Sequence, residues 1–352
     1  MILFPGLIDP HVHLRDPGQS IKEDFYTGTA AALAGGYTTI IDMPNNTVPI
    51  TSLKRLKEKV DIAQDKIVCD MGFYFGSLGE NLSQFEKIQK NIIGLKVYLN
   101  ATTGNYVVNE DVFKKICNAW PNSRAGGKPI LVHAEENILE KIIDIASKHD
   151  QRLHVCHISS QNELQFIIDA KNRGVKITCG VTPHHLFLTV EDEKRLGPFG
   201  KMKPVLKSKK DVNFLWKNLN VVDVVESDHA PHTFEEKQSD NPPFGVPGLE
   251  TTLPLLLTAA SENRISYKEI IRLCHTNSLK IFSLPRDDTT YVEVAEDEEW
   301  VIDNKKLMTK CKWSPFHGQK VKGKVKRVFI RGQKVFEDGK ILVKPGFGKI
   351  LP

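Results

Sequence analysis

The sequence predicts an α/β fold, a (β/α)₈ TIM-like barrel, with a small β appendage formed mainly by the C-terminal segment. Short apolar, β-branched runs alternate with helical stretches over most of the chain. Such alternation indicates a parallel sheet, and a count of eight strands favours a closed barrel over an open sheet. From about residue 289 the pattern changes to short strands, which predicts the appendage.

The eight expected barrel strands are runs rich in Val, Ile and Leu. They lie near residues 6–10, 38–42, 67–73, 93–98, 129–133, 153–157, 175–180 and 221–227. Helices are expected between them, for example over residues 22–34, 51–63, 135–148 and 160–173. Turn glycines such as Gly174 precede several strands, as expected where a helix ends and the chain reverses.

The C-terminal pattern predicts a separate β unit. The segments YVEVAE, KVKRVFIRG and KVFEDGKILV each resemble a short strand. The hydrophobic start of the chain, Ile2–Phe4, could pair with them. We therefore expect a barrel over residues 1–288 and a small β subdomain over residues 289–352 that packs with the N-terminal residues.

Composition narrows the class of protein. The chain has 352 residues, of which 40% are hydrophobic, so it can bury a large core. No apolar run approaches the roughly 18 residues that span a bilayer, and no signal peptide is visible. The six cysteines are scattered and form no CxxC pair, which is typical of reduced thiols. We expect a cytoplasmic protein with no membrane partner.

The basic charge is concentrated near the C-terminus. Residues 305–352 hold 14 Lys and Arg against two acidic residues, although the whole chain carries only +5. In KVKGKVK, lysines alternate with Val and Gly, as on a strand with one solvated face. Docking onto another protein stays open as an alternative. Nucleic acid is the least favoured partner.

Ligand-type side chains stand at the ends of the predicted strands, where a barrel of this type carries its chemistry. His11 and His13, two residues apart on a strand, point the same way, as two ligands of one metal must. Later strands end at Lys96, His133, His157 and Asp228. Each has a structural alternative: a lone histidine is often a core residue, and Asp228 could cap a helix. The set together predicts a metal site.

Lys96 is the most informative of these residues. It lies in the apolar segment IIGLKVYLN, where an ammonium is costly unless it is paired. A neutral amine there could take up CO₂ and become a carbamate, whose two oxygens could bridge two metals a few ångström apart. The alternative is a lysine that is salt-bridged or extends its charge to solvent.

Motifs along the whole chain carry a family resemblance. PGLIDPHVHLRDPG, MPNN, GLKVYL, VHAEE, CHIS, TPHHL, ESDHAPH and PGLET occur in this order, followed by WSPFHGQKVKGKV and PGFG. The chain thus resembles dihydroorotases of the amidohydrolase superfamily. It is most similar to the dihydroorotase domain of the eukaryotic multifunctional protein that also contains carbamoyl-phosphate synthetase and aspartate transcarbamoylase. Those domains also begin just before the first barrel strand, so we expect an excised domain that is linked to these partners in a longer chain. We also expect a homodimer.

The resemblance implies a role for each candidate site residue. His11, His13 and Asp228 match the ligands of one zinc, His133 and His157 those of a second, and carbamylated Lys96 would bridge both. Substrate contacts are implied for Arg15, Asn45, His232, Thr102, Thr103, Lys203, Pro247 and Gly248. Without the resemblance, Arg15 and Asn45 could equally order a loop.

The sequence also departs from the family pattern. Animal members have a Glu where this chain has Gly180, and some are reported to hold a third zinc with that Glu and the cysteine that corresponds to Cys156. Because Gly180 has no side chain, we expect two zincs. Lys203 stands where Arg is frequent, and Thr103 where some members have Phe, so substrate contacts should differ from those of the animal enzymes.

The implied activity is reversible cyclisation of N-carbamoyl-L-aspartate to L-dihydroorotate and water in de novo pyrimidine biosynthesis. In the ring-opening direction a zinc-bridging hydroxide would attack the amide, with Asp228 as base and then acid. Two alternatives stay open. One is another cyclic amidohydrolase, a dihydropyrimidinase or allantoinase. The other is a catalytically inactive scaffold for a transcarbamoylase.

Overall fold

The computed structural model describes residues 1–102, 106–122, 124 and 126–352. Its centre is a sheet of eight parallel strands, hydrogen-bonded in sequence order. The strands are β2 (Leu7–Val12), β3 (Tyr37–Asp42), β4 (Asp70–Gly76), β5 (Gly94–Tyr98), β6 (Ile130–His133), β7 (Leu153–Val155), β8 (Ile177–Val181) and β9 (Val224–Val225). Each overlaps one of the eight predicted strands.

A single bridge nearly closes the barrel. Val12 pairs in parallel with His229, and the His13 amide donates to the His229 carbonyl at 2.8 Å. The first and last strands therefore meet at the edge where both end. This confirms the predicted (β/α)₈ class.

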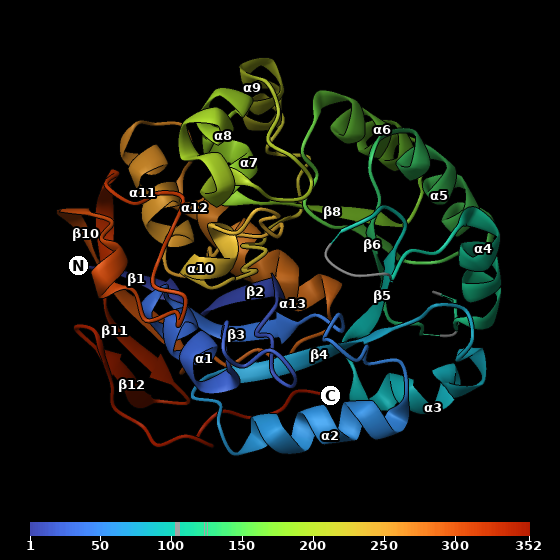
Figure 1. Cartoon of the computed structure of the whole chain (residues 1–352), viewed down its shortest axis with the longest axis horizontal. Coiled ribbons are helices and arrows are strands. Elements are labelled where there is room, and N and C mark those ends of the chain that lie inside the picture. The colour runs from blue at the N-terminus through green and yellow to red at the C-terminus, as the bar shows by residue number, and fades with distance from the viewer. Residues whose placement is uncertain (103–105, 123, 125) are drawn as a thin grey trace.

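Helices surround the barrel. Figure 1 shows α2 to α6 as an arc outside β4 to β8. The helices are α1 (Phe25–Ala34), α2 (Leu53–Gln64), α3 (Phe85–Ile88), α4 (Glu110–Ala119), α5 (Glu136–Lys148), α6 (Gln161–Asn172), α7 (Pro183–Phe187), α8 (Val190–Leu196), α9 (Lys209–Lys217), α10 (Phe234–Lys237), α11 (Thr252–Ser261), α12 (Tyr267–Ile271) and α13 (Asn277–Ile281). Local capping sets their starts: at α6, Ser160 and Glu163 form a reciprocal capping box.

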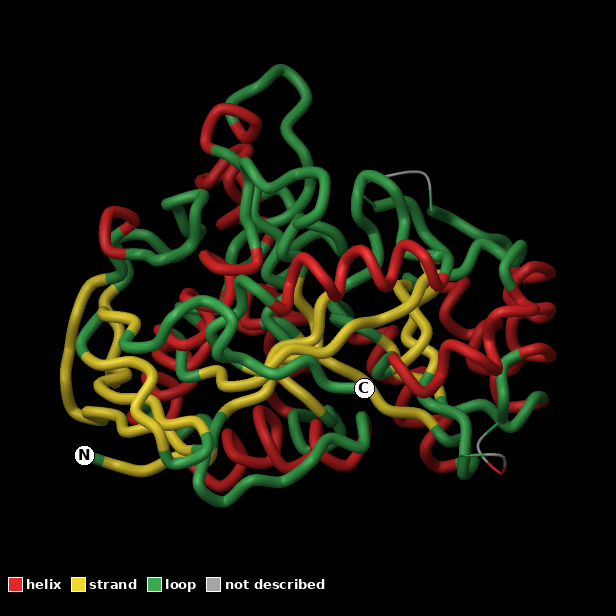
Figure 2. The backbone as a smooth tube through the Cα atoms, turned by 90° about the horizontal axis from the view of Figure 1, so that it is seen from below, coloured by secondary structure: helices red, strands yellow, loops and turns green. Residues whose placement is uncertain are grey.

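The appendage is a five-stranded antiparallel sheet in the order β1-β10-β11-β12-β13. Its strands are β1 (Ile2–Pro5), β10 (Tyr291–Val301), β11 (Lys320–Ile330), β12 (Gln333–Glu337) and β13 (Lys340–Ile341). Ile2 pairs with Val294, so the start of the chain joins this sheet as expected. Figure 2 shows the sheet near the N-terminus, beside the barrel strands.

The lysines of β11 lie on one face of the appendage. Val321 and Val325 are buried, whereas Lys324 and Lys326 both form ion pairs with Glu298 on β10. This is the alternation of a strand with one solvated face. Much of the basic charge of this segment is therefore balanced within the sheet.

The C-terminal segment returns to the barrel after β13. The Met71 amide of β4 donates to the Lys349 carbonyl, and the Leu351 amide donates to the Met71 carbonyl. Elsewhere, the Met308 and Thr309 amides both donate to the carboxylate of the half-buried Glu250. The appendage is thus hydrogen-bonded to the barrel at two separate places.

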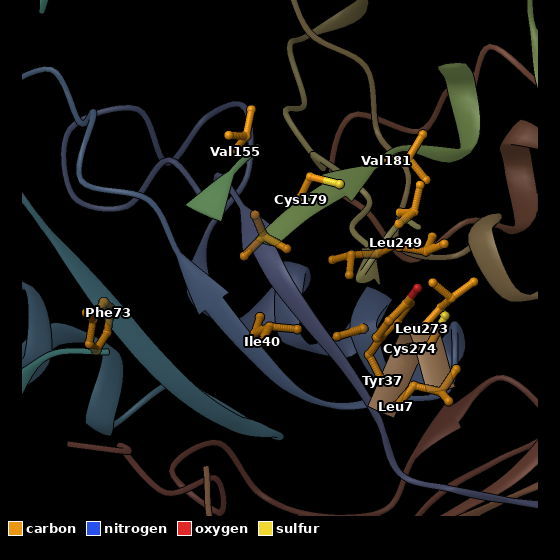
Figure 3. Close-up of a cluster of buried hydrophobic side chains, with 14 of the residues drawn as sticks. Leu7, Tyr37, Ile40, Phe73, Val155, Cys179, Val181, Leu249, Leu273 and Cys274 are labelled. Atoms are coloured by element: carbon orange, nitrogen blue, oxygen red, sulfur yellow. The ribbon is translucent and has the colours of Figure 1, made fainter. Parts of the chain in front are cut away.

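The core contains side chains from successive strands. Leu7, Ile40, Phe73 and Val155 come from four different strands and are fully buried. Figure 3 shows several of these side chains with Cys179 and Val181 of β8. Interior packing of this kind fixes the strand ends relative to one another. Among the described residues, no helix is long and apolar enough to cross a membrane.

Candidate metal site

Ligand-type side chains from four strands converge at the carboxyl edge of the barrel. His11 lies on β2, His133 ends β6, His157 follows β7 and Asp228 follows β9. All four are buried. His157 and Asp228 adopt left-handed backbone angles, with φ of 36° and 45°, and so does Arg15 at 66°. Non-glycine residues in this region are strained and tend to occur at functional sites.

The first group consists of His11, His13 and Asp228. The Nε2 atoms of His11 and His13 lie 3.3 and 3.0 Å from Asp228 Oδ1. Burial alone would raise the pKa of Asp228, but the adjacent His11 and the hydrogen bond from His13 outweigh burial and hold that pKa well below its usual value. The carboxylate is therefore present as an anion.

The second group consists of His133 and His157. His133 Nδ1 lies 3.1 Å from His157 Nε2, and both rings are buried. Burial, first of all, lowers the pKa of each ring below the ordinary histidine value. Two neutral imidazoles therefore face each other through ring nitrogens.

Two of these histidines have a fixed orientation. His13 Nδ1 lies 2.7 Å from Asn45 Oδ1, and His133 Nε2 lies 3.2 Å from Glu135 Oε1. An acceptor behind one ring nitrogen can hold the proton there, so that the other nitrogen can give its lone pair to a metal in place of its present contact. In each ring, the nitrogen opposite this acceptor is the one that faces the other ligand-type residues. The contact of Glu135 with His133 was not predicted from the sequence, although Glu135 stands in the VHAEE motif.

Lys96 lies beside both groups. It is buried, its Nζ lies 3.0 Å from Cys156 Sγ, and it is 4.9 Å from the centre of the Tyr98 ring. Its positive charge contributes to lowering the pKa of His133 and of His157. Lys96 thus places its amine next to the histidines. Among the described residues, the structure records no ion pair for it.

The geometry of the donor atoms fits metal ions. Ligand atoms about 2.0–2.1 Å from a tetrahedral zinc are separated by about 3.3 Å. The separations within the two groups, 3.3, 3.0 and 3.1 Å, are close to this value. The buried Nδ1 atoms of His11 and His157 also have no hydrogen-bond partner. Imidazole and carboxylate donors are those that zinc takes.

A small cavity opens onto these groups. Nine of the residues predicted for the site contribute to its wall, and they are His11, His13, Arg15, Asn45, Thr102, His133, His157, Lys203 and Asp228. Tyr98, Ala230, Phe244 and Gly245 complete the lining. The cavity therefore places the positive charges of Arg15 and Lys203 around a space that ends at the histidines.

Arg15 is held at the cavity wall by the segment that follows β9. Its Nε donates to the Pro231 carbonyl at 3.1 Å, and its Nη2 lies 3.2 Å from His232 Nε2. His232 is fully buried and does not line the cavity. Burial, first of all, and the charges of Arg15 and Lys22 hold the pKa of His232 far below its ordinary value. His232 therefore contacts the site through Arg15.

The remaining predicted substrate contacts lie elsewhere. Pro247 and Gly248 are buried, and the Gly248 amide donates to His229 Nδ1 at 3.2 Å. Neither contributes to the lining. Thr103 lies outside the described residues. Thr102, just before it, does line the cavity.

A buried lysine is hydrogen-bonded to residues 243–245, the segment that contributes Phe244 and Gly245 to the cavity wall. Lys237 of α10 donates to the carbonyls of Lys201, Pro243 and Gly245 at 3.0, 2.9 and 3.1 Å. Burial, followed by the charge of Lys201, lowers the pKa of Lys237 to about 7. This residue was not predicted from the sequence, because nothing in its neighbourhood distinguishes it from a solvated helix lysine.

A buried glutamate lies beneath the first group. Glu226 is fully buried and follows β9 directly. Its carboxylate accepts from the His157 amide and lies 3.5 Å from His11 Nδ1 and 3.6 Å from His154 Nε2. Burial alone would raise the pKa of Glu226, but His11 and His154 outweigh it and hold this pKa well below the usual value.

Fold and site define the class of protein. The chain belongs to the amidohydrolase family, whose model matches residues 2–335. Membership in this family implies a metal cofactor, in agreement with the donor geometry.

Within the family, the curated relatives of this chain include multifunctional proteins and dihydroorotases. The chain is 45% identical over 351 residues to the multifunctional protein CAD of Squalus acanthias, covering 99% of this chain but only 16% of that protein. It is 36% identical to the dihydroorotase of Pyrococcus furiosus, covering 99% of this chain and 85% of that enzyme. The chain therefore corresponds to a small part of the multifunctional protein and to most of the archaeal one.

Solved structures share the fold. The L-hydantoinase (dihydropyrimidinase) from Arthrobacter aurescens superposes with a TM-score of 0.94 at 25% identity, covering 99% of this chain and 88% of that one. The inactive dihydroorotase-like domain of the Chaetomium thermophilum CAD-like multifunctional protein superposes with a TM-score of 0.84 at 26% identity, covering 100% and 99%. The fold alone thus occurs with different activities.

Proposed function

We propose that this chain is a dihydroorotase that catalyses the reversible cyclisation of N-carbamoyl-L-aspartate to L-dihydroorotate and water, in pyrimidine biosynthesis. One observation carries the choice of substrate. Arg15 and Asn45 stand on the wall of the cavity that ends at the histidines. A guanidinium and an amide suit a planar carboxylate. Dihydroorotate has a free carboxylate on its ring, whereas dihydrouracil and simple hydantoins have none.

Two zinc ions would be held by the two groups of donors. His11, His13 and Asp228 would hold one, His133 and His157 the other, and a carbamate on Lys96 would bridge them. Bound zinc supplies a nucleophile at neutral pH by lowering the pKa of water, and it polarises a carbonyl as a Lewis acid. Lys96 has room for this role only if its amine leaves the Cys156 thiol, which lies 3.0 Å away.

Asp228 would move the proton. Its Oδ1 faces His11 and His13, and the carboxylate is ionised, so it can accept a proton at the centre of the site. In ring opening it would pass that proton to the departing ring nitrogen, and ring closure would reverse the transfer. The left-handed backbone at Asp228 turns its side chain into the cavity from the end of β9.

The other side chains would bind and orient the substrate. Arg15 and the Asn45 amide nitrogen would take the carboxylate, with His232 supporting Arg15 from behind. Lys203 and Thr102 stand on the same wall and would contact the rest of the substrate, together with Thr103. Pro247 and Gly248 would act indirectly, by shaping the turn beside His229.

A comparison of substrates tests this proposal against a dihydropyrimidinase or an allantoinase. We expect turnover of dihydroorotate to exceed that of dihydrouracil, hydantoin and allantoin by several orders of magnitude in kcat/KM. Replacing Arg15 by Met should reduce this preference, because the carboxylate loses its partner. Comparable turnover of dihydrouracil by the unmodified protein would reverse the assignment.

An inactive scaffold is the second candidate, favoured by the likeness to the inactive Chaetomium domain. This chain keeps the full set of proposed ligands, which are four histidines, Lys96 and Asp228. Metal analysis separates the candidates: two zincs per chain are expected for the enzyme, and well under one for the scaffold.

The wider context is also proposed. The likeness to one section of CAD supports linkage to carbamoyl-phosphate synthetase and aspartate transcarbamoylase in a longer protein. A homodimer and a cytoplasmic location are consistent with that setting. We also propose a division into a barrel over residues 1–288 and a β subdomain over residues 289–352 that packs with the N-terminal residues, supported by the start of β10 at Tyr291.

A further inference from the structure

Glu226 has no part in the proposed reaction, yet it is a fully buried carboxylate among the proposed metal ligands. One carboxylate oxygen accepts from the His157 amide. The other, Oε2, has no hydrogen-bond partner, and neither has His11 Nδ1, which lies 3.5 Å away. A buried charge without a role is costly and is seldom kept.

Gly180 makes the space that this carboxylate occupies. A Cβ at position 180 of β8 would lie 2.4 Å from the Glu226 carboxyl carbon, closer than real contacts allow. In the register of β8 with β9, Gly180 lies opposite Val224. Glu226 comes two residues after Val224, so its side chain lies close to position 180. Glu226 therefore fills the volume that a side chain at position 180 would take. Although Gly180 has no side chain, the carboxylate of Glu226 occupies this place.

Three of the proposed ligand histidines follow one pattern. In His13 the nitrogen that points away from the other ligands faces Asn45, and in His133 it faces Glu135. In His11 the corresponding nitrogen is Nδ1, and the acceptor on that side is Glu226. His11 Nε2 meanwhile points to Asp228. An acceptor behind a ligand histidine fixes its tautomer and its ring orientation.

We propose that Glu226 is a positioning residue that holds His11, and through its backbone His157, in the orientation required for metal binding. With a metal on His11 Nε2, the Nδ1–H group would donate to Glu226 Oε2, which lies 3.5 Å away. Gly180 is required for this arrangement, because only glycine at position 180 leaves space for the Glu226 carboxylate. The inference rests on the metal site of the proposed function, and it concerns affinity for the metal and not the reaction.

Zinc affinity tests the proposal directly. We expect Glu226→Gln and Gly180→Ala each to weaken zinc binding by about 10- to 100-fold, the usual effect of losing such a partner. Each variant should still take up two zincs at saturation. The measurement is competition with a chromophoric chelator, with circular dichroism to verify folding. Gly180→Ala perturbs the carboxylate from the neighbouring strand, so it keeps the test informative should Glu226→Gln fold poorly.

Glu250→Gln is the matched control. Glu250 is a half-buried carboxylate that accepts backbone amides, and among the described residues the structure records no contact between it and a proposed ligand. The zinc affinity of this variant should equal that of the unmodified protein. Unchanged affinity in both Glu226→Gln and Gly180→Ala would overturn the proposal. So would three zincs in the unmodified protein and loss of one in Glu226→Gln, because Glu226 would then be a ligand itself.

The same samples separate this inference from the proposed function. If the zinc-loaded protein fails to turn over dihydroorotate, the proposed function fails. The comparison of zinc affinities among the variants still decides the role of Glu226.

Discussion

Asp228 Oδ1 lies 3.0 Å from His13 Nε2, although 215 positions separate the two residues in the sequence. The contact exists because β2 and β9 meet where the barrel nearly closes, at the bridge between Val12 and His229. The contact that nearly closes the barrel therefore also brings these two proposed zinc ligands together.

Asp228→Asn is expected to lower kcat by about 10²- to 10⁴-fold, the range for loss of a general acid–base group. The amide cannot take up the proton, whereas its oxygen can still face His11 and His13. Fold and much of the zinc content should be retained, as measured by circular dichroism and metal analysis. A variant that keeps more than about a few per cent of activity would contradict the assignment, because losing the proton-transferring group costs at least about 10²-fold.

Arg15→Lys should separate charge from geometry. The ammonium keeps the positive charge but cannot form a paired contact with a carboxylate. Hydrogen bonds to charged groups contribute about 1.5–3 kcal/mol, so kcat/KM for dihydroorotate should fall by about 10- to 150-fold. Turnover of dihydrouracil, which has no carboxylate to lose, serves as the control. Equal losses on both substrates would argue that Arg15 only orders its loop.

Lys237→Met should raise KM more than it lowers kcat. The substitution leaves the carbonyls of Lys201, Pro243 and Gly245 without their common donor, so the wall at residues 243–245 loosens while the ligands stay in place. The measurement is steady-state kinetics with dihydroorotate. Lys171→Met is a matched control, because Lys171 donates to the Val221 carbonyl near the start of β9, away from the cavity. A fall in kcat with KM unchanged would reject this role.

Stability should fall as pH rises through the range in which Glu250 ionises. Burial raises the pKa of Glu250 from 4.5 to about 7, so the folded protein keeps a proton that the unfolded chain has released. Its contribution is complete below pH 4.5 and is lost as pH approaches 7. The order of magnitude is about 3 kcal/mol, from about 1.36 kcal/mol per pKa unit. In urea unfolding, Glu250→Gln should flatten this part of the profile, and an unchanged profile would refute it.

The barrel could be predicted from the sequence because each strand is a short β-branched run with a helix behind it. The ligands could be predicted because they stand where those runs end. The proposed role of Glu226 could not be predicted, because it depends on the strand register. That register places Val224, and with it the nearby Glu226, beside Gly180. The prediction for β9 was also too long: the strand ends at Val225, since the backbone turns away toward the left-handed Asp228.

Lys237 shows a second limit of prediction from sequence. Its three acceptors come from two segments that meet only in the folded chain, at Lys201 and at Pro243 and Gly245. Composition and periodicity describe which face of an element is buried. They do not identify a lysine whose charge is used inside the protein.

Dihydroorotase activity itself can be measured by a spectrophotometric assay of dihydroorotate ring opening with zinc-replete, folded protein. The assay is repeated in the direction of ring closure with N-carbamoyl-L-aspartate. We expect turnover in both directions with two zincs bound per chain. No turnover in either direction by a sample that holds its zinc would contradict the assignment of this chain as a dihydroorotase.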